Sequence, residues 1–405
     1  MDFHDAPEEA AFRTEVRAFI RDECPAGISR RGFGAMFGGG GWDDIRMGTD
    51  EYRKLNADWA KKLAARGWIA PAWPKEYGGA GMTVMQQFIF NQEMASAGAP
   101  RGGNYGIGTG WAGPTIILYG TEEQKQKYLP PIVKGDAIWC QGFSEPGSGS
   151  DLASLQTRAV RDGDDFVING QKIWTSGAQF AHWMFMMART DPDAPKHKGI
   201  SYFLVDMKSP GITVRPLTNL ANQNMFNEVF FEDVRVPAKN LVGELNRGWY
   251  IGTTTLDFER SSIGSAVGIR LQLDGLVEYA KEHEKDGTSR TARLSSLKTE
   301  LADRYVEANV ARLMSYRVVT MQAKGMVPNH EASMTKLFAS ELNQRIARTG
   351  MKVLGLYGQL FGDDAPMKGR YESSYMTSLS STIAGGTSEI QRNIIATRGL
   401  GLPRD

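Results

Sequence analysis

Apolar side chains recur at helical spacing along the first third of the chain. Stripes with a period near 3.6 residues run over positions 10–20, 51–65 and 83–95. Thr121 and Gln124 form a capping box that opens a further helix, which Pro130 and Pro131 soon end. We therefore expect a helical N-terminal domain over residues 1–136, beginning with an amphipathic surface helix.

The pattern changes to that of strands between about residues 137 and 245. The dipeptides Asp162-Gly163 and Asn169-Gly170 are typical of tight turns and bracket the short segment FVI. Further strands are indicated by GISYFLVDM, GITVRPL and NEVFFEDVRV. This composition predicts a small antiparallel β domain over 137–245.

After Gly248 the helical spacing returns, through Leu256, Ile263, Val267 and Leu271 and on past Leu276. Long helices are expected over 293–324 and 330–354, and a last one opens at Thr387 or Ser388. The order of helices, strands and helices predicts an α+β fold whose third domain spans 246–405.

Composition narrows the function classes. The 405 residues carry a formal net charge of +1, with both signs spread along the chain, so no nucleic-acid tract or membrane-binding patch is indicated. Cys24 and Cys140 lack the spacing of a zinc site, so we expect no metal, and they fit a reducing cytoplasm. The N-terminus has acidic residues where a signal peptide needs basic ones, and no run approaches the roughly 20 apolar residues that span a bilayer. The glycine-rich stretch 30–42 predicts a mobile loop.

Two segments have the composition of a phosphate or heterocycle site. QGFSEPGSGSD, residues 141–151, offers glycines and hydroxyls whose backbone N–H groups can meet a phosphate, although a solvated turn has the same composition. KIWTSG, residues 172–177, places Trp174 beside Thr175 and Ser176, which suits a flat heterocycle with a polar edge. The alternative for Trp174 is a half-buried side chain on a sheet.

A third segment, GGTSEIQRNII at 385–395, opens a helix. Thr387 and Ser388 are both candidate N-caps, and Ser388 has capping-box spacing to Gln391. Free N–H groups at a helix N-terminus attract anions such as a diphosphate or an enolate. Many helices begin in this way without a ligand.

The segment LDFER, residues 256–260, contains a candidate general base. The helical neighbours of Glu259 are Leu256, Ser262, Thr255, Ile263, Gly252 and Ala266. This small and mostly apolar face would desolvate a carboxylate and raise its pKa toward the range of a base. The alternative is an ion pair between helices that holds Glu259.

These segments, in this order and over nearly the whole chain, resemble the acyl-CoA dehydrogenase family. The resemblance implies an N-terminal helical domain, a middle β domain and a C-terminal four-helix-bundle-like domain that clasp FAD and an acyl-CoA thioester, usually in a dimer of dimers. It also implies electron transfer to an electron-transfer flavoprotein. By resemblance the FAD-binding residues are Gln141, Phe143, Ser144, Gly149, Ser150, Trp174, Thr175, Ser176, Thr387 and Glu389.

The same resemblance assigns the substrate contacts and the chemistry. Ser150, Asp257, Arg260 and Gly386 correspond to substrate-binding positions. A carboxylate removes the α-proton while the β-carbon passes hydride to the flavin, and a backbone N–H that maps to Gly385 stabilises the thioester oxygen. Many members hold the base in Tyr-Glu-Gly-Thr, which is Ala384-Gly385-Gly386-Thr387 here. Other members hold it in a Glu-Arg pair, where Glu259 stands, so we identify Glu259 as the base.

The chain departs from the family at two further places. The family arginine that reaches a neighbouring subunit's FAD is matched by His283, for which Arg290 or Arg293 would substitute. The Gln-x-x-Gly-Gly stretch appears with Lys352 and Leu356 in place of the glutamine and one glycine. Both a homotetramer and a tetramer that contains a second, related chain are therefore expected alternatives.

Three readings of function follow. The first is a dehydrogenase, the second a flavin oxidase, oxygenase or desulfinase on the same fold, and the third an FAD-sharing partner subunit. Loss of the Tyr-Glu pair, together with the glycine stretch at 32–41, suggests room for a branched, dicarboxylic or polycyclic acyl group.

Overall fold

The computed structural model describes residues 5–25, 28, 50–100, 106–260, 265–282, 295–362 and 364–403. Of residues 50–53, 56, 257–260, 265 and 295 it describes the backbone alone. The predicted loop at 30–42 lies outside the described residues, as do Ser262, Ile263, His283, Arg290 and Arg293.

The chain forms two compact units. The helical unit contains residues 1–40, 82–100 and 260–405, and the sheet unit contains 41–81 and 101–259. The α-helices are α1 (Pro7–Glu23), α3 (Asp50–Ala65), α4 (Val84–Ala97), α5 (Gly113–Tyr119), α6 (Glu122–Lys134), α7 (Gly248–Arg260), α8 (Ser265–Lys281), α9 (Ser295–Ala323), α10 (His330–Leu354), α11 (Arg370–Ser381) and α12 (Ser388–Ile394). Helices before residue 135, strands from 139 to 242 and helices from 248 confirm the α+β fold. The three domain boundaries stay a prediction.

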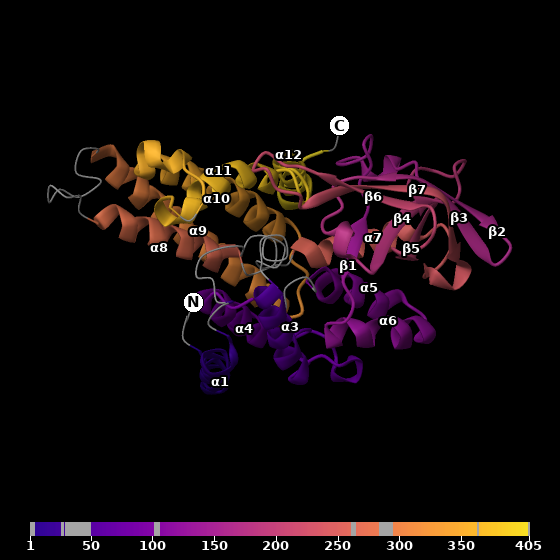
Figure 1. Ribbon diagram of the computed structural model, residues 1–405, viewed down its shortest axis with the longest axis horizontal. Coiled ribbons are helices and arrows are strands. Elements are labelled where there is room, and N and C mark those ends of the chain that lie inside the picture. Colours follow the sequence, from indigo (N-terminus) through magenta and orange to yellow (C-terminus); the bar gives the residue numbers. More distant parts are fainter. Residues whose placement is uncertain are drawn as a thin grey trace. The chain divides into compact units, whose positions relative to one another are not determined.

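One sheet organises the sheet unit (Figure 1). Its strands are β1 (Trp139–Gly142), β2 (Arg158–Asp162), β3 (Asp165–Lys172), β4 (Trp183–Arg189), β5 (Ile200–Asp206), β6 (Ile212–Leu217), β7 (Phe226–Pro237) and β8 (Leu241–Val242). The strands lie in the order β6-β7-β3-β2-β4-β5-β8, with β1 beside β4. Most neighbours are antiparallel, while β1 and β2 pair with β4 in parallel. Buried side chains such as Ile168, Met186 and Phe203 fill the core against this sheet.

One predicted turn is wrong. Asp162-Gly163 does connect β2 to β3, but Asn169-Gly170 lies inside β3, where the register against β7 shifts between Ile168 and Gly170. Gly170 has φ 146°, and a Cβ there would lie 2.7 Å from the Thr157 Cα, so only glycine fits this bulge. The asparagine side chain pairs with Asp233 across the sheet instead of closing a turn.

The capping box at α6 is confirmed. Thr121 Oγ1 accepts from the Gln124 backbone N–H at 3.2 Å, and Gln124 Oε1 accepts from that of Thr121 at 3.1 Å. The helix carries Pro130 and Pro131 inside its last turn and ends at Lys134, where Gly135 takes the left-handed conformation. Its Gln124 amide donates to two carbonyls beside β8, which fastens α6 to the sheet.

Four helices, α8, α9, α10 and α11, run side by side in the helical unit (Figure 1). Their shared core includes Leu273, Leu276, Leu342, Ile346 and Tyr371. This arrangement confirms the bundle-like C-terminal fold.

Helix α1 joins α4 in the same unit through a buried carboxylate, Glu93, which accepts hydrogen bonds from Arg13 and Arg17. Among the helices described, none combines the length and apolar character that a membrane crossing requires.

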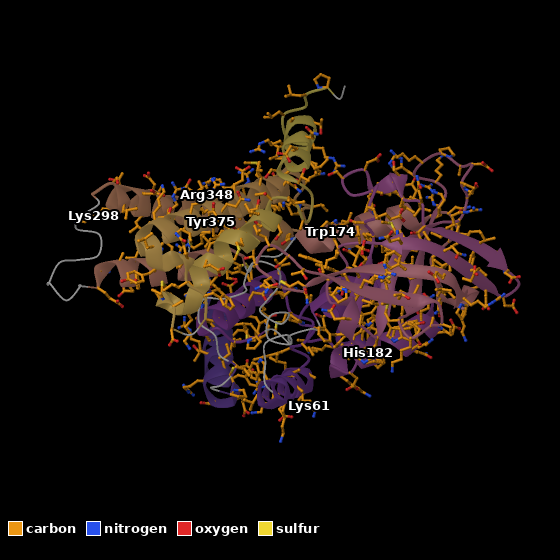
Figure 2. All side chains as sticks on the ribbon, turned by 45° about the horizontal axis from the view of Figure 1, so that its top comes forward. Lys61, Trp174, His182, Lys298, Arg348 and Tyr375 are labelled. Carbon is orange, nitrogen blue, oxygen red and sulfur yellow. The ribbon has the colours of Figure 1, made fainter. Side chains whose placement is uncertain are left out.

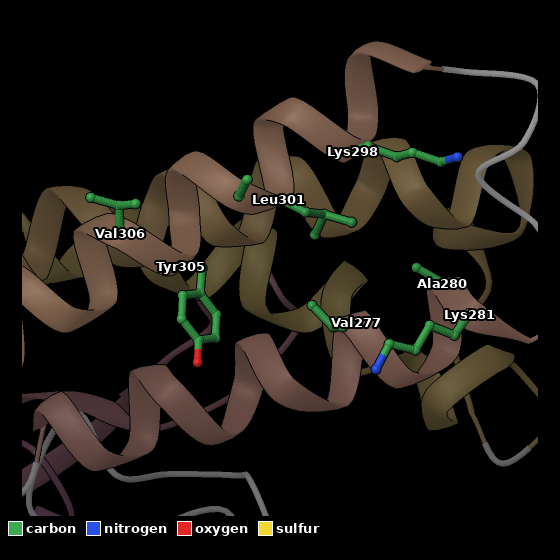
Figure 3. A pocket seen from close by; sticks show the side chains of 8 residues that line it. Val277, Ala280, Lys281, Lys298, Leu301, Tyr305 and Val306 are labelled. Atoms are coloured by element: carbon green, nitrogen blue, oxygen red, sulfur yellow. The ribbon is translucent and has the colours of Figure 1, made fainter.

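A groove of about 590 Å³ lies between α8 and α9 (Figure 3). Its walls are mainly apolar, with Val277, Leu301 and Val306 among them, and Lys281 and Lys298 also line it. The Tyr305 hydroxyl accepts a hydrogen bond from Arg270 on α8 at 2.7 Å. None of the candidate site residues lines this groove.

Candidate functional site

The segment 141–151 leaves β1 and forms a compact loop on the sheet unit. Phe143 is buried edge-on against Phe185 and Tyr202. Glu145 and Ser148 exchange backbone hydrogen bonds at 2.9 and 3.0 Å, which closes the loop. Gly149 and Ser150 are exposed at its tip, and a Cβ at Gly149 would meet no atom within 4 Å. The loop thus presents open backbone, as the approach of a phosphate requires.

A buried ion pair lies beneath this loop. Lys172, at the end of β3, is 0% exposed, and its Nζ donates to Glu145 Oε1 at 2.7 Å and to the Phe143 carbonyl at 3.0 Å. Burial opposes the charge on Glu145, but the ammonium of Lys172 and two backbone N–H groups outweigh it and lower the pKa of Glu145. Burial also lowers the pKa of Lys172, to about 8.

The segment after β3 departs from ordinary strand geometry. Trp174 has φ 60°, a left-handed conformation that is uncommon for a bulky residue and is concentrated at functional sites. Trp174, labelled in Figure 2, follows the end of β3 and is 60% exposed. Its ring meets that of Phe226 edge-on. The alternative of a half-buried tryptophan on the sheet is therefore wrong. The Thr175 backbone is held on both sides by Asn227.

Each of the segments 141–151 and 172–177 contains one buried polar atom without a partner in the part of the chain that the structure describes. Gln141 Nε2 and Thr175 Oγ1 are both buried and have no hydrogen-bond partner among the described residues. Buried polar groups are nearly always paired with protein, ordered water or a bound molecule, so each of these two atoms needs a further partner. Beside them stand an exposed aromatic face and the half-buried Ser176 hydroxyl. A flat ring system with a polar edge and a phosphate tail fits this donor set.

Helix α7 carries the candidate base. Glu259, Asp257 and Arg260 lie on its last turn, and their side chains are outside the described part of the structure. Thr255 and Gly252, which share the helix face of position 259, are fully buried or nearly so. The Thr255 hydroxyl lies 2.9 Å from that of Thr115 on α5. Position 259 thus has buried neighbours on its own helix, and the surroundings of the Glu259 side chain stay a prediction.

The double-glycine turn belongs to the helical unit. Gly385 and Gly386 have φ of 64° and 88°. Lys336 on α10 donates to the carbonyls of Ser381 and Gly386, at 3.2 and 2.6 Å. Gln391 Nε2 donates to the carbonyls of Gly385 and Gly386, at 3.1 and 3.3 Å. Four carbonyl contacts thus fix the turn, and its two carbonyls point toward these donors.

Thr387 is the N-cap of α12, with its side chain accepting from the Ile390 N–H at 3.1 Å. The expected capping box of Ser388 and Gln391 is wrong, because Gln391 turns back to the glycine carbonyls. The Ser388 hydroxyl is buried without a partner in the described part of the chain. Glu389 is exposed in the first turn, and its own backbone N–H lowers its pKa.

The structure brings the candidate residues together in two groups. Gln141, Phe143, Ser144 and the 174–176 segment meet in the sheet unit, where the Ile173 N–H donates to the Ser144 carbonyl at 2.9 Å. Gly385, Gly386, Thr387 and Glu389 form the turn of the helical unit. Lys352 forms an ion pair with Glu300 at 2.9 Å, and Leu356 is 84% exposed.

Sequence reasoning missed Glu145, Lys172, Lys336 and Gln391 as supports of these segments. A signal for Lys172 was present, because Phe166, Ile168 and Lys172 fall on alternate positions of one strand and are all buried. No comparable signal exists for Lys336, which acts on residues 45 and 50 positions away.

Three family models match the chain. They are the N-terminal domain of acyl-CoA dehydrogenase at residues 43–136, the middle domain at 140–234 and the C-terminal domain at 246–400. The chain belongs to the acyl-CoA dehydrogenase family and is an enzyme of that type.

Individual relatives of the chain belong to the same family. Acyl-CoA dehydrogenase IpdE1 of Mycobacterium tuberculosis is 37% identical over 97% of this chain and 98% of its own length. Acyl-CoA dehydrogenase FadE26 of the same organism is 40% identical over 85% of this chain and 87% of its own. Among solved structures, the Tcur3481-Tcur3483 steroid ACAD superposes with a TM-score of 0.84 at 34% identity over all of both chains. The ChsE4-ChsE5 complex from Mycobacterium tuberculosis gives 0.83, also at 34% identity and full coverage of both.

Proposed function

We propose that this chain binds FAD and dehydrogenates an acyl-CoA thioester between its α- and β-carbons, giving a trans-2-enoyl thioester. The observation that carries the proposal is the pair of buried, unpartnered polar atoms, Gln141 Nε2 and Thr175 Oγ1, beside the left-handed and exposed Trp174. They lie in the segments that the family resemblance assigns to the flavin.

Each segment has a role that its own geometry supports. The open loop tip at Gly149 and Ser150 would receive the diphosphate and the near part of the substrate. Trp174 would cover a face of the ring system, while Thr175 and Ser176 supply hydroxyls to its polar edge. FAD, when bound, supplies the hydride acceptor for the β-carbon. Thr387 and Glu389 would contact the cofactor from the start of α12.

Proton removal is assigned to Glu259. An α-proton beside a thioester is a weak acid, so a carboxylate removes it only if the carbonyl oxygen is stabilised as negative charge develops. The Gly385 backbone N–H is the proposed donor to that oxygen. Lys336 and Gln391 hold the turn that contains it, so the donor is preorganised rather than drawn from a flexible segment. Asp257, Arg260 and Gly386 would line the substrate beside it.

We further propose a bulky, ring-bearing acyl group and a second chain in the assembly. Two solved relatives that match this chain over its full length are a steroid ACAD and the ChsE4-ChsE5 complex, and the second name contains two different components. Ala384 and Gly385 replace the large Tyr-Glu pair of many members, which frees volume. Electrons would pass to an electron-transfer flavoprotein, with the enzyme as a homo- or heterotetramer.

The test is anaerobic mixing of the full chain with a panel of straight, branched, dicarboxylic and polycyclic acyl-CoA thioesters. Flavin absorbance is followed for wild type and for Glu259→Gln. Loss of a general base is expected to slow flavin bleaching by about 10²–10⁴-fold while ligand binding persists. Bleaching of the variant at the wild-type rate would remove Glu259 from the mechanism.

The same experiment separates the other functions. Rapid re-oxidation of the reduced flavin by air would favour an oxidase or oxygenase. A colourless protein that becomes yellow only with a related chain would favour the FAD-sharing subunit. Turnover of short straight-chain thioesters alone would end the proposal of a bulky acyl group.

A further inference from the structure

The ion pair of Glu145 and Lys172 is unusual for a sheet of apolar side chains. Lys172 is 0% exposed and Glu145 is 8% exposed on their side chains. Removing two charges from water is costly, and a buried pair is often no more stable than apolar residues of similar volume. The lowered pKa of Lys172 also indicates a net cost of holding this charge, because burial outweighs the attraction of Glu145.

The contacts of the pair indicate a role other than stabilising the fold. Glu145 accepts from the N–H groups of Gln156 and Thr157, at 2.6 and 2.9 Å. Lys172 donates to Glu145 and to the Phe143 carbonyl. The pair therefore joins three backbone stretches: the loop after β1, the end of β3 and the segment just before β2.

Two of these stretches are the proposed flavin segments. Lys172 stands two residues before Trp174, and Glu145 directly follows Ser144. One backbone hydrogen bond, from Ile173 to Ser144, joins the segments directly at 2.9 Å. A single bond leaves a hinge between them, and the ion pair provides the second and third points of attachment.

We propose that Glu145 and Lys172 are positioning residues that hold the 144–151 loop in register with Trp174, Thr175 and Ser176, so that both segments meet one flavin. This inference rests on the proposed function. It differs from a role in folding, because the sheet core beneath is already filled by apolar side chains. Supporting residues of this kind set the precision of a binding site.

The experiment compares FAD binding with stability in the full chain after flavin removal. The variants are Lys172→Met and the double variant Glu145→Gln with Lys172→Met. Arg235→Met is the matched control, since it removes an exposed ion pair with Asp162 on the same sheet. FAD titration gives the Kd, the visible spectrum reports the environment of the bound flavin, and thermal unfolding of the flavin-free chain gives stability.

The double variant is expected to keep an unfolding midpoint close to that of wild type, while its Kd for FAD rises tenfold or more and the flavin spectrum shifts. Lys172→Met alone leaves a buried carboxylate and is expected to lose both stability and FAD affinity. Arg235→Met is expected to match wild type in both.

Two results would overturn the inference. A double variant that binds FAD with wild-type affinity and spectrum shows that the pair does not position the segments. A double variant that fails to fold shows that the pair serves the fold itself. If wild-type chain binds no FAD, the proposed function fails first and this inference fails with it, an outcome distinct from the other two.

Discussion

The Nζ of Lys336 lies 2.6 Å from the carbonyl oxygen of Gly386 and 3.2 Å from that of Ser381. One cation thus spans the turn that connects α11 to α12. Because the turn contains the backbone N–H proposed to stabilise the thioester oxygen, its rigidity bears directly on rate.

Lys336→Met is expected to lower kcat by about tenfold or more. Hydrogen bonds to a charged group contribute about 1.5–3 kcal/mol, and both carbonyls lose theirs here. Lys281→Met is the control: it removes an exposed ion pair with Glu278 on α8 and leaves the turn intact. Steady-state kinetics on one thioester should show wild-type kcat for the control. Equal rates for Lys336→Met and wild type would contradict the proposed support.

Gly386→Ala is expected to lower the free energy of unfolding by more than the left-handed backbone conformation alone would cost. A left-handed φ costs an alanine roughly 1–2 kcal/mol. In addition, the new Cβ would lie 2.5 Å from Gln391 Nε2, and Gln391 is fully buried and bonded to the turn. Gly325→Ala isolates the first cost, because Gly325 has φ 71° and open space around it. Urea unfolding should show a larger loss for Gly386→Ala, by about 1–3 kcal/mol.

The sequence was sufficient for the elements whose signal is local. The capping box at Thr121 and the apolar stripe over 83–95 place α6 and α4 within a few residues of their true ends. The turn expected at Asn169-Gly170 failed because a bulge and a turn use the same dipeptide, and only the pairing of β3 with β7 distinguishes them.

The candidate site likewise contains residues that the local sequence identifies and residues that it does not. The 141–151 and 174–176 segments were identifiable because their residue types are those of the chemistry. Lys336 and Gln391 were not, since each acts through contacts that depend on packing. Gln391 even matched a local capping rule with Ser388, which its contacts to the glycine carbonyls override.

A pair of glycines on one stretch offers a test of packing in the sheet unit. A Cβ at Gly113 would lie 1.7 Å from the buried Trp73 ring, whereas one at Gly110 would meet no atom within 4 Å. Gly113→Ala is expected to lower the free energy of unfolding by about 3 kcal/mol through overpacking. Gly110→Ala is expected to leave it unchanged or raise it by about 0.4–1 kcal/mol. Denaturant titration measures the free energy of unfolding of both variants. Equal values for Gly113→Ala and Gly110→Ala would contradict the close contact of Gly113 with Trp73.

The pKa of Lys172 predicts a pH dependence of stability. Burial lowers the pKa of this group from 10.5 to about 8 in the folded chain. In the unfolded chain it holds its proton to about pH 10.4. Between pH 8 and about 10.4 the unfolded state therefore binds more protons, and the contribution of Lys172 to the free energy of unfolding rises with pH. Its penalty is fully present below pH 8 and is relieved above it.

The double variant Glu145→Gln with Lys172→Met removes the titrating lysine and leaves no unpaired carboxylate in its place, so the difference between wild type and this double variant isolates the effect. That difference is expected to shift in favour of wild type by about 1–3 kcal/mol as the pH rises from 7 to 9.5, since one pKa unit corresponds to roughly 1.4 kcal/mol. Urea unfolding at several pH values measures it, with Arg235→Met showing no such trend because its exposed guanidinium does not titrate in this range. A constant difference across the range would show that the folded chain keeps Lys172 protonated, and that the attraction of Glu145 outweighs burial.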